Sequence, residues 1–311
     1  MRVKASIAVA VSVALGWPVL VLAPVVVSAE SSGAIAGQTR SRAASIASGD
    51  SHTCAIVANG RVVCWGDDSL GQLGNGPGVG SVDAPGDPIV LPTGTHAIAL
   101  TAGAAHTCAL LSDGSVSCWG DDSRGQLGNG AVTGSIDAPG PAIGLTGPAS
   151  AVAAGAKHTC ALLSDGSVSC WGDDSSGQVG NGLTLGDVTA PSPTLSVPGF
   201  ATAIAAGDAH TCAVMASAKV SCWGSDSSGQ IGNGASSTTD ITSPSPALTL
   251  PVTSGAKAIA LGANHSCAVL MTSEVSCWGE FVGIPRSLAK KIANDPKVAA
   301  AIAKGARFLG L

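Results

Sequence analysis

An internal repeat constrains this 311-residue chain more than any other feature. Residues 106–130 and 158–182 differ at two positions only, and related copies begin at His52, His210 and His265. The second cysteine of each copy follows that of the preceding copy after 54, 52, 52 and 55 residues. A period near 50 residues, with short apolar runs between glycines, is the length of one propeller blade rather than of a helical repeat.

Each period contains short β-type runs. In the second copy these are 97–100, 106–111 and 115–119, and a fourth strand is expected near 89–91, ahead of the copy. Helical spacing is absent from the repeats, and Gly or Pro interrupts the pattern often. We therefore expect an all-β fold, a β-propeller of about five four-stranded repeats of ~52 residues whose blades cover each other's sheet faces.

Residues 44–279 carry a family resemblance. Their repeat follows the string A-x-x-G-x-x-H-T-C-A-L-x-x-D-G-x-V-x-C-W-G-x-x-x-x-G-Q-x-G-N-G, and it resembles the regulator of chromosome condensation repeat in its bacterial form. The resemblance implies a β-propeller, usually seven-bladed. Here the fifth copy stops at Trp278-Gly279. A smaller ring, an open arc, assembly with a second chain that completes the ring, and a shortened gene product all remain open.

The ten cysteines form pairs ten residues apart within each copy: Cys54 with Cys64, Cys108 with Cys118, Cys160 with Cys170, Cys212 with Cys222, and Cys267 with Cys277. A three-residue loop at 112–114 places Cys108 directly opposite Cys118, whereas a two-residue turn at 113–114 makes them diagonal neighbours. Copies four and five favour the three-residue loop, because they lack an Asn-Gly or Asp-Gly pair and keep the spacing. We predict five disulfides, one per hairpin.

The repeated polar residues also allow metal sites. His106, Cys108 and Cys118 resemble a three-ligand zinc set. The N-terminal segment described below predicts export, however, and an exported chain is expected to have oxidised cysteines. The simpler interpretation is that the equivalent histidines form hydrogen bonds within their own turns; they are His52, His106, His158, His210 and His265. We expect neither a metal nor another cofactor.

An acidic turn precedes Gly-Gln in three copies, at 67–69, 121–123 and 173–175. Asp-x-Ser-x-Gly hints at a calcium loop, but the late glutamate of an EF-hand is missing. An Asx turn is the favoured interpretation. The tryptophan that recurs at one position of all five copies indicates packing rather than recognition.

Composition and repetition exclude several function classes. The net charge is −5, and residues 43–279 hold 17 acidic and 5 basic side chains, which argues against a nucleic-acid binder. Catalysis needs one asymmetric set of groups, whereas Ser, His, Asp and Cys recur here at equivalent places, so we expect no enzyme. The variable loops 77–96, 131–150, 183–202 and 235–257 are expected to form a protein-binding rim.

The two ends of the chain differ from the repeats. Residues 1–29 resemble a signal peptide, with a membrane anchor as the alternative, and 30–43 form a linker. Residues 280–311 hold six basic and two acidic side chains, and Asp295 with Pro296 predicts the start of a helix. This basic helical tail either rests on the acidic repeats or contacts a membrane surface.

Together these features predict a secreted or cell-envelope propeller that acts as a protein-interaction module or scaffold. The alternative is a secreted inhibitor of an extracellular enzyme, because the chain looks similar in compartment and repeat type to the beta-lactamase inhibitory type. The resemblance supplies no matched binding residues for that role. The nucleotide-exchange activity of eukaryotic family members is not expected, since an exported chain does not meet their small GTPase partner.

Overall fold

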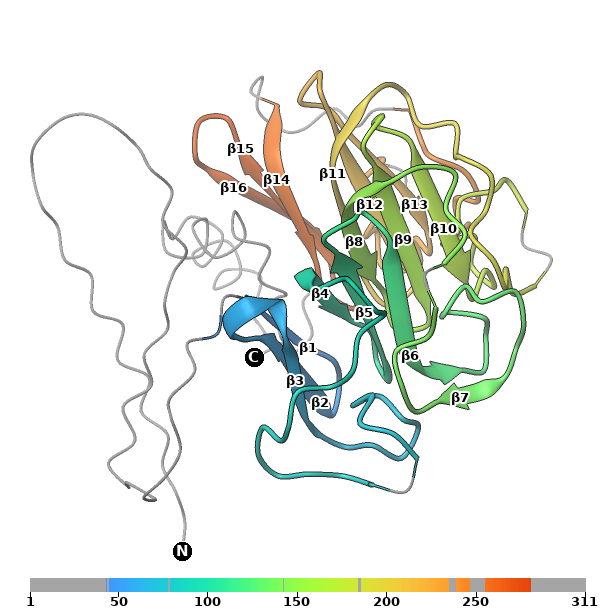
Figure 1. The fold of residues 1–311 in the computed structure, drawn as a ribbon. Helices are drawn as coiled ribbons and strands as arrows, with labels where there is room; N and C mark the ends of the chain where they lie inside the picture. Colours follow the sequence, from blue (N-terminus) through green and yellow to red (C-terminus); the bar gives the residue numbers. More distant parts are fainter. Residues whose placement is uncertain are drawn as a thin grey trace, which may run out of the picture.

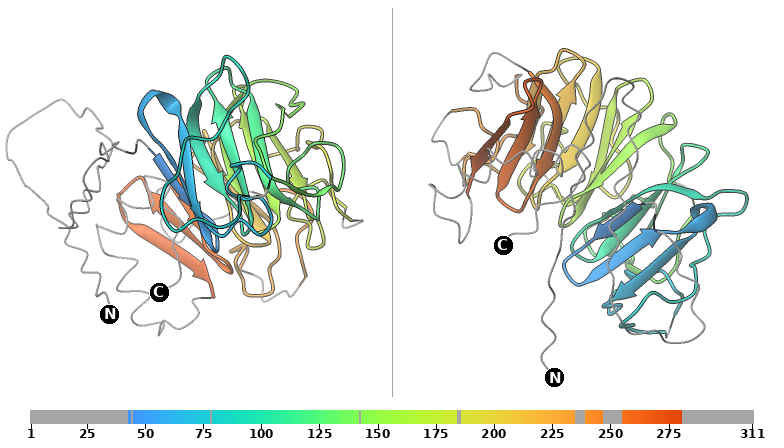
Figure 2. Two further views of the ribbon diagram at one scale, coloured as in Figure 1. Left: turned by 60° about the horizontal axis from the view of Figure 1, so that its bottom comes forward. Right: turned by 90° about the vertical axis from the view of Figure 1, so that its left-hand side faces the viewer.

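The computed structural model of the chain describes residues 43, 45–77, 79–141, 143–183, 186–234, 239–246 and 255–280. These residues form five antiparallel sheets that stand side by side as blades (Figures 1 and 2). Apart from one 3-10 turn at Ala58–Gly60, every regular element of this part is a strand. The predicted all-β propeller of about five blades is confirmed. The predicted signal peptide, linker and basic tail lie outside the described residues, except residue 43 and Glu280.

Each blade runs from an inner strand through two further strands towards the outer edge. Blade 1 consists of β1 (Ser45–Ser48), β2 (His52–Ile56) and β3 (Val62–Gly66). Blade 2 consists of β4 (Ala97–Ala102), β5 (His106–Leu111), β6 (Val116–Asp122) and β7 (Gly134–Ile136). Blade 3 consists of β8 (Ala149–Ala154), β9 (His158–Leu163) and β10 (Val168–Gly172). Blade 4 consists of β11 (Ala201–Ala206), β12 (His210–Met215) and β13 (Val220–Gly224). Blade 5 consists of β14 (Ala256–Leu261), β15 (His265–Leu270) and β16 (Val275–Gly279).

The central hairpin of each blade has the predicted three-residue loop. In blade 2, Leu111 N donates to Ser115 O at 2.8 Å, and Gly114 occupies the left-handed region at φ 81°. Ala218 and Ser273 take the same conformation in blades 4 and 5, at φ 61° and 69°. The loop therefore survives there without glycine.

This loop brings the two cysteines of every copy together, and all five predicted disulfides are present. The bonded cysteines are directly opposed on the two strands of the hairpin, with Cα atoms 4.0–4.1 Å apart. The alternative of diagonal neighbours across a two-residue turn is therefore wrong. From blade 1 to blade 5 the bonds join Cys54 to Cys64, Cys108 to Cys118, Cys160 to Cys170, Cys212 to Cys222, and Cys267 to Cys277.

The prediction of a fourth strand at 89–91 is wrong. Ile89 N donates to Val62 O, but no strand of the described chain includes residues 89–91. The outer edge is a regular strand only in blade 2, as β7, and elsewhere in the described chain it pairs through isolated bridges at Val82, Val188 and Ile241.

The hydrophobic core lies between the blades rather than within one sheet sandwich. Four apolar clusters join blades 1 to 2, 2 to 3, 3 to 4 and 4 to 5. In the second of these, Cys118 and Leu127 of blade 2 meet Leu163 and Trp171 of blade 3. In blades 2, 3 and 4 both faces of the two central hairpin strands are therefore buried between neighbouring blades, as predicted.

The blades form an open arc. The inner strands follow one another from β1 through β4, β8 and β11 to β14, and Figure 2 shows blades 1 and 5 at opposite ends of the series. Within the described residues, blades 5 and 1 share no apolar cluster. The five inner strands border a channel of about 440 Å³. No described helix has the length and apolar character needed to cross a bilayer.

Candidate functional site

A backbone carbonyl of the Gly-Gln turn joins each blade to the next. Gln72 O of blade 1 accepts hydrogen bonds from two side chains of blade 2, the Thr107 hydroxyl and the Trp119 indole, both at 3.0 Å. The carbonyl oxygens of Gln126, Gln178 and Gln230 each accept the equivalent two hydrogen bonds from the following blade, at donor–acceptor distances of 2.8–3.0 Å. We call this the Gln-turn contact. It explains why tryptophan occupies a fixed position of the repeat.

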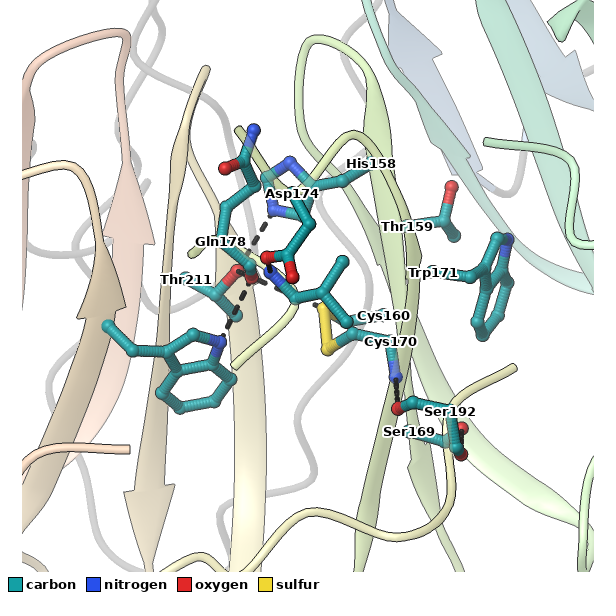
Figure 3. The surroundings of a disulfide bond; sticks show 12 residues. His158, Thr159, Cys160, Ser169, Cys170, Trp171, Asp174, Gln178, Ser192 and Thr211 are labelled. Carbon is teal, nitrogen blue, oxygen red and sulfur yellow. Dashed lines mark hydrogen bonds between the residues drawn. A yellow bond between two sulfur atoms is a disulfide. The ribbon is translucent and has the colours of Figure 1, made fainter. Parts of the chain in front are cut away.

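The repeated histidine extends the same contact. His158 Nε2 lies 2.9 Å from Thr211 Oγ1 in blade 4, beside the Cys160–Cys170 disulfide (Figure 3). Because the hydroxyl of Thr211 donates its single proton to Gln178 O, the histidine nitrogen must be the donor. The histidines form hydrogen bonds within their own turns through the backbone, as from Gly155 N to His158 O at 2.8 Å. For the side chains of His52, His106, His158 and His210 the expectation is wrong, since Nε2 of each reaches the neighbouring blade.

The buried position of these histidines affects their charge. Burial lowers the pKa of His210 to about 3, and it also lowers the pKa of His265. A neutral imidazole suits a site where Nε2 donates to a buried hydroxyl. Glycine makes room for the ring, because a Cβ atom at Gly155 would overlap the imidazole of His158. The Gly-x-x-His part of the repeat is thus a packing requirement.

The acidic turn holds the glutamine in place. Asp67 Oδ1 accepts the Ser69 backbone N–H at 3.2 Å, which is the predicted Asx turn. Asp67 Oδ2 accepts the Gln72 side-chain amide at 2.9 Å, while Asp68 Oδ1 accepts Leu73 N at 2.9 Å. The two carboxylates therefore orient the turn whose carbonyl faces the next blade.

The residues considered for zinc are engaged in other contacts. The sulfur atoms of Cys108 and Cys118 are bonded to each other, and His106 Nε2 lies 2.9 Å from Thr159 Oγ1. Zinc requires thiolates, which a disulfide does not supply. Within the described residues, no three His, Cys, Asp or Glu side chains gather as a metal site requires.

One carboxyl group of the acidic turns is poorly satisfied. Asp174 is buried, and its Oδ2 has no hydrogen-bond partner, although Oδ1 accepts Val179 N at 2.9 Å. In blade 2 the equivalent Asp122 Oδ2 accepts Thr133 Oγ1 at 2.8 Å, and the sequence has Leu185 at the position of that threonine. Desolvation raises the pKa of Asp174 to about 6.

Replacing Asp174 by asparagine is expected to stabilise the protein at pH 7. The raised pKa means that the folded chain binds the proton more tightly, so the carboxyl favours folding below pH 4 and this advantage is lost as the pH rises through about 6. Asp174→Asn removes the buried charge and keeps an acceptor for Val179 N. Urea unfolding should show a gain of about 2 kcal/mol at pH 7 and almost none at pH 4.

Asp165→Asn is the matched control. Asp165 is exposed in the hairpin loop of the same blade, where hydrogen bonds from the Ser167 hydroxyl and backbone lower its pKa. A carboxyl whose pKa is lowered by folding stabilises the protein at pH values above its pKa in the unfolded chain, and this stabilisation is lost as the pH falls. Asp165→Asn should therefore be slightly less stable than the parent chain at pH 7. Equal effects of the two substitutions would contradict the assignment of Asp174 as the poorly satisfied carboxyl.

A groove opens where the outer edges of blades 1 and 2 meet. It has a volume of about 380 Å³ and lies between residues 74–90 of blade 1 and residues 138–139 of blade 2. Val79 and Val90 border it and are 54% and 84% exposed. Gly76 N donates to Asp137 O at 2.8 Å, which fixes one wall to the neighbouring blade.

The groove combines an apolar lining with a few polar groups. Asn75 Oδ1 is buried in its lining without a hydrogen-bond partner, and the side chain of Asp87 is exposed at its edge. The sequence places most of this groove in the variable loop 77–96, but it does not predict the groove itself, because the fold of that loop depends on contacts with blade 2.

These features define the class of protein: an open β-propeller whose blades are joined by repeated Gln-turn contacts and whose variable loops remain at the outer edge. Residues 22–283 match the RCC1-like domain, and the chain belongs to this family. The predicted family is therefore confirmed. The bacterial form of the repeat and the likeness to a beta-lactamase inhibitor stay predictions.

Several known proteins are similar to this chain over part of their length. The chain is 32% identical over 263 residues to the ultraviolet-B receptor UVR8 of Arabidopsis thaliana, covering 83% of this chain and 58% of UVR8. It is 34% identical over 192 residues to the probable E3 ubiquitin-protein ligase HERC6 of Homo sapiens, covering 60% and 19%. The crystal structure of Prp20p from Saccharomyces cerevisiae matches with a TM-score of 0.65 and 25% identity, covering 78% and 59%. The chain thus spans less than two thirds of each of these proteins.

Proposed function

We propose that this chain is an exported, non-enzymatic propeller that binds a protein partner through the groove between blades 1 and 2. The observation that carries the proposal is that the repeated residues and the variable loops have different structural roles. The repeated polar residues are used in contacts within and between blades, as in the Gln-turn contact of Gln72 with Thr107 and Trp119. The variable loops build the groove.

The chemistry of the groove favours an extended peptide segment. Exposed Val79 and Val90 offer an apolar surface. Asp83 and Asp87 are exposed in the same loop. A partner segment with small apolar side chains and basic flanks is complementary to this surface.

Related propellers support binding of proteins. Yeast RCC1 (Prp20) has been crystallised with Kap60, and the structure of Prp20p was described together with its binding to Gsp1p and histones. The five disulfides support export, since such bonds persist in oxidising compartments. Secretion or retention in the cell envelope, and membrane contact through 280–311, remain parts of the proposal.

Val90→Asp tests the groove. The full chain is immobilised and exposed to culture supernatant or envelope extract, and captured proteins are quantified by mass spectrometry after cross-linking. We expect one or a few partners, and we expect Val90→Asp to reduce their recovery at least tenfold because a charge replaces an apolar contact.

Ile98→Asp is the matched control. Ile98 is 53% exposed in β4 and lies outside the groove lining, so recovery should be unchanged. Equal loss with both variants, or no loss with Val90→Asp, would refute binding at the groove. Recovery of nothing above an unrelated control protein would refute the interaction function as a whole.

A further inference from the structure

We infer that the channel between the inner strands is a binding site for an uncharged small molecule that has an aliphatic body and one polar edge. The strands β1, β4, β8, β11 and β14 border this channel, whose volume is about 440 Å³. Small-molecule sites typically have volumes of about 300–1,000 Å³ and an apolar lining with a few polar groups. The groove lies elsewhere, at the outer edges of blades 1 and 2, so the inference goes beyond the proposed interaction function.

The lining of the channel is mainly aliphatic. In every copy, the residue six positions before the histidine is a branched aliphatic residue of the inner strand, and it borders the channel; these residues are Ile46, Leu100, Val152, Ile204 and Ile259. The other bordering residues of β8, β11 and β14 are alanines and Leu261. This side of the channel therefore matches the aliphatic body of a ligand, whose burial is favourable.

The channel does not suit a charged ligand. Among the described residues that border it, none is charged, and residues 43–279 hold 17 acidic but only 5 basic side chains. A carboxylate or a phosphate would lose its hydration in this lining without gaining a partner of opposite charge, and the surrounding acidic residues would repel it. An alcohol, a ketone or an ester of similar size avoids both penalties.

The hydroxyl groups of the channel gather on one side. Ser45 and Ser48 lie in β1, and Thr101 lies in β4. At the positions equivalent to Ser45 and Thr101, the other four copies have alanine, so these hydroxyls are departures from the repeat rather than parts of it. Thr101 Oγ1 accepts Ala154 N at 3.0 Å, which leaves the hydroxyl proton as a donor to a ligand oxygen. Blades 1 and 2 thus supply the polar edge of the site.

The lining is most accessible at the end of the arc. The four residues equivalent to Ile46 each pack in or against the apolar cluster that joins their blade to the preceding one. Ile46 lies in blade 1, at one end of the series (Figure 2), and its side chain is 62% exposed. It is therefore an apolar residue of the lining that a bound ligand can still cover.

A competition experiment tests the chemistry of the ligand. The full chain is titrated with Nile red, an uncharged dye whose fluorescence increases in apolar sites, and the dye is then displaced with decanol or with decanoate. These two competitors share an alkyl chain and differ in charge at pH 7. We expect decanol to displace the dye at a concentration at least about tenfold lower than decanoate, because the channel does not compensate the carboxylate.

Two isoleucines locate the site. Ile46→Glu places a charge in the channel lining and should weaken binding of the dye and of decanol by about tenfold. Ile98→Glu is the matched control, because Ile98 is 53% exposed in the inner strand of blade 2 but does not border the channel. Its effect on binding should stay within about twofold. Far-UV circular dichroism establishes that both variants are folded.

A third variant tests the polar edge. Ser45→Ala introduces the residue that the other copies have at this position, so the fold should be unchanged. Loss of one hydroxyl should weaken binding of decanol by about threefold.

Three results would overturn the inference. The first is equal displacement by decanol and decanoate, or no binding of the dye to the full chain. The second is an equal loss with Ile46→Glu and Ile98→Glu, which would place the dye outside the channel. The third is binding only after removal of residues 1–42, which would mean that this segment of the chain fills the channel itself. None of these results bears on the groove, whose test reads the recovery of protein partners with Val90→Asp.

Discussion

Trp171→Ala is expected to lower the free energy of unfolding by about 4 kcal/mol, which is the usual range for truncating a buried aromatic residue. Trp171 is fully buried between blades 2 and 3, where it packs with Leu127 and Leu163. Its indole also donates to Gln126 O at 2.9 Å. The substitution leaves both a cavity and a buried carbonyl that has lost one of its donors. Urea unfolding followed by far-UV circular dichroism measures the loss.

Trp65→Ala is the control at the end of the arc. Trp65 is half-buried and has no acceptor among the described residues, so its truncation should cost about 1–2 kcal/mol. The chemistry of the two substitutions is identical, and the difference between them isolates the contact between two blades. Equal losses would mean that the blades contribute stability independently and that the Gln-turn contact adds little.

The central position of Trp171 has a further consequence. In a linear array each repeat contacts only its neighbours, so stability is approximately the sum of repeat and interface contributions. Weakening the interface between blades 2 and 3 divides the arc into two and three blades. We expect the unfolding transition of Trp171→Ala to broaden, whereas that of Trp65→Ala stays cooperative, because the change at the end of the arc removes no interface.

Much of the fold could be predicted because it follows from two periodicities. The 52-residue period specifies blades, and the ten-residue cysteine spacing specifies the hairpin register. In blade 4 that spacing places Cys212 opposite Cys222, and in blade 5 it places Cys267 opposite Cys277. The loop at Ala218 shows why spacing was the better guide than turn composition, because a residue other than glycine adopts the left-handed conformation there at φ 61°.

The contacts between blades could not be predicted from the repeat. His158 contacts Thr211 rather than Thr159, the threonine of its own copy, yet both threonines have the same identity and the same neighbours in sequence. A repeated sequence does not distinguish a contact within one copy from a contact with the next copy. For this reason the sequence did not predict that the histidine side chains bond to the next blade.

The repeat pattern predicts neither the groove nor the open arc. The outer loop of blade 1 pairs with β3 through an isolated bridge at Val82, and residues 82–90 border the groove together with Ala138 and Pro139 of blade 2. Ring closure depends on the angle between blades, and this angle is set by packing of side chains such as Leu127 and Trp171. The sequence therefore left several assemblies open.

Reduction of all five disulfides is expected to unfold the chain. Each bond joins cysteines ten residues apart and so closes a short hairpin loop, to which the chain-entropy relation assigns about 2–3 kcal/mol. Their combined loss, on the order of 10 kcal/mol, is comparable with the whole stability of an ordinary domain. Incubation with dithiothreitol in urea, alkylation and removal of urea should give a chain without the β-type circular dichroism of the oxidised protein.

Intact mass and a single-pair variant make this test quantitative. The untreated chain should weigh about 10 Da less than the fully reduced chain, since each of the five bonds replaces two hydrogens. Replacing Cys160 and Cys170 by alanine should cost about 3 kcal/mol, because loss of the covalent link and the small buried volume act together. If the free energy of unfolding of the reduced chain lay within about 2 kcal/mol of that of the oxidised chain, this account would be contradicted. In that case the four clusters between blades and their Gln-turn contacts would suffice to hold the arc, and the cysteines would not be needed for the fold.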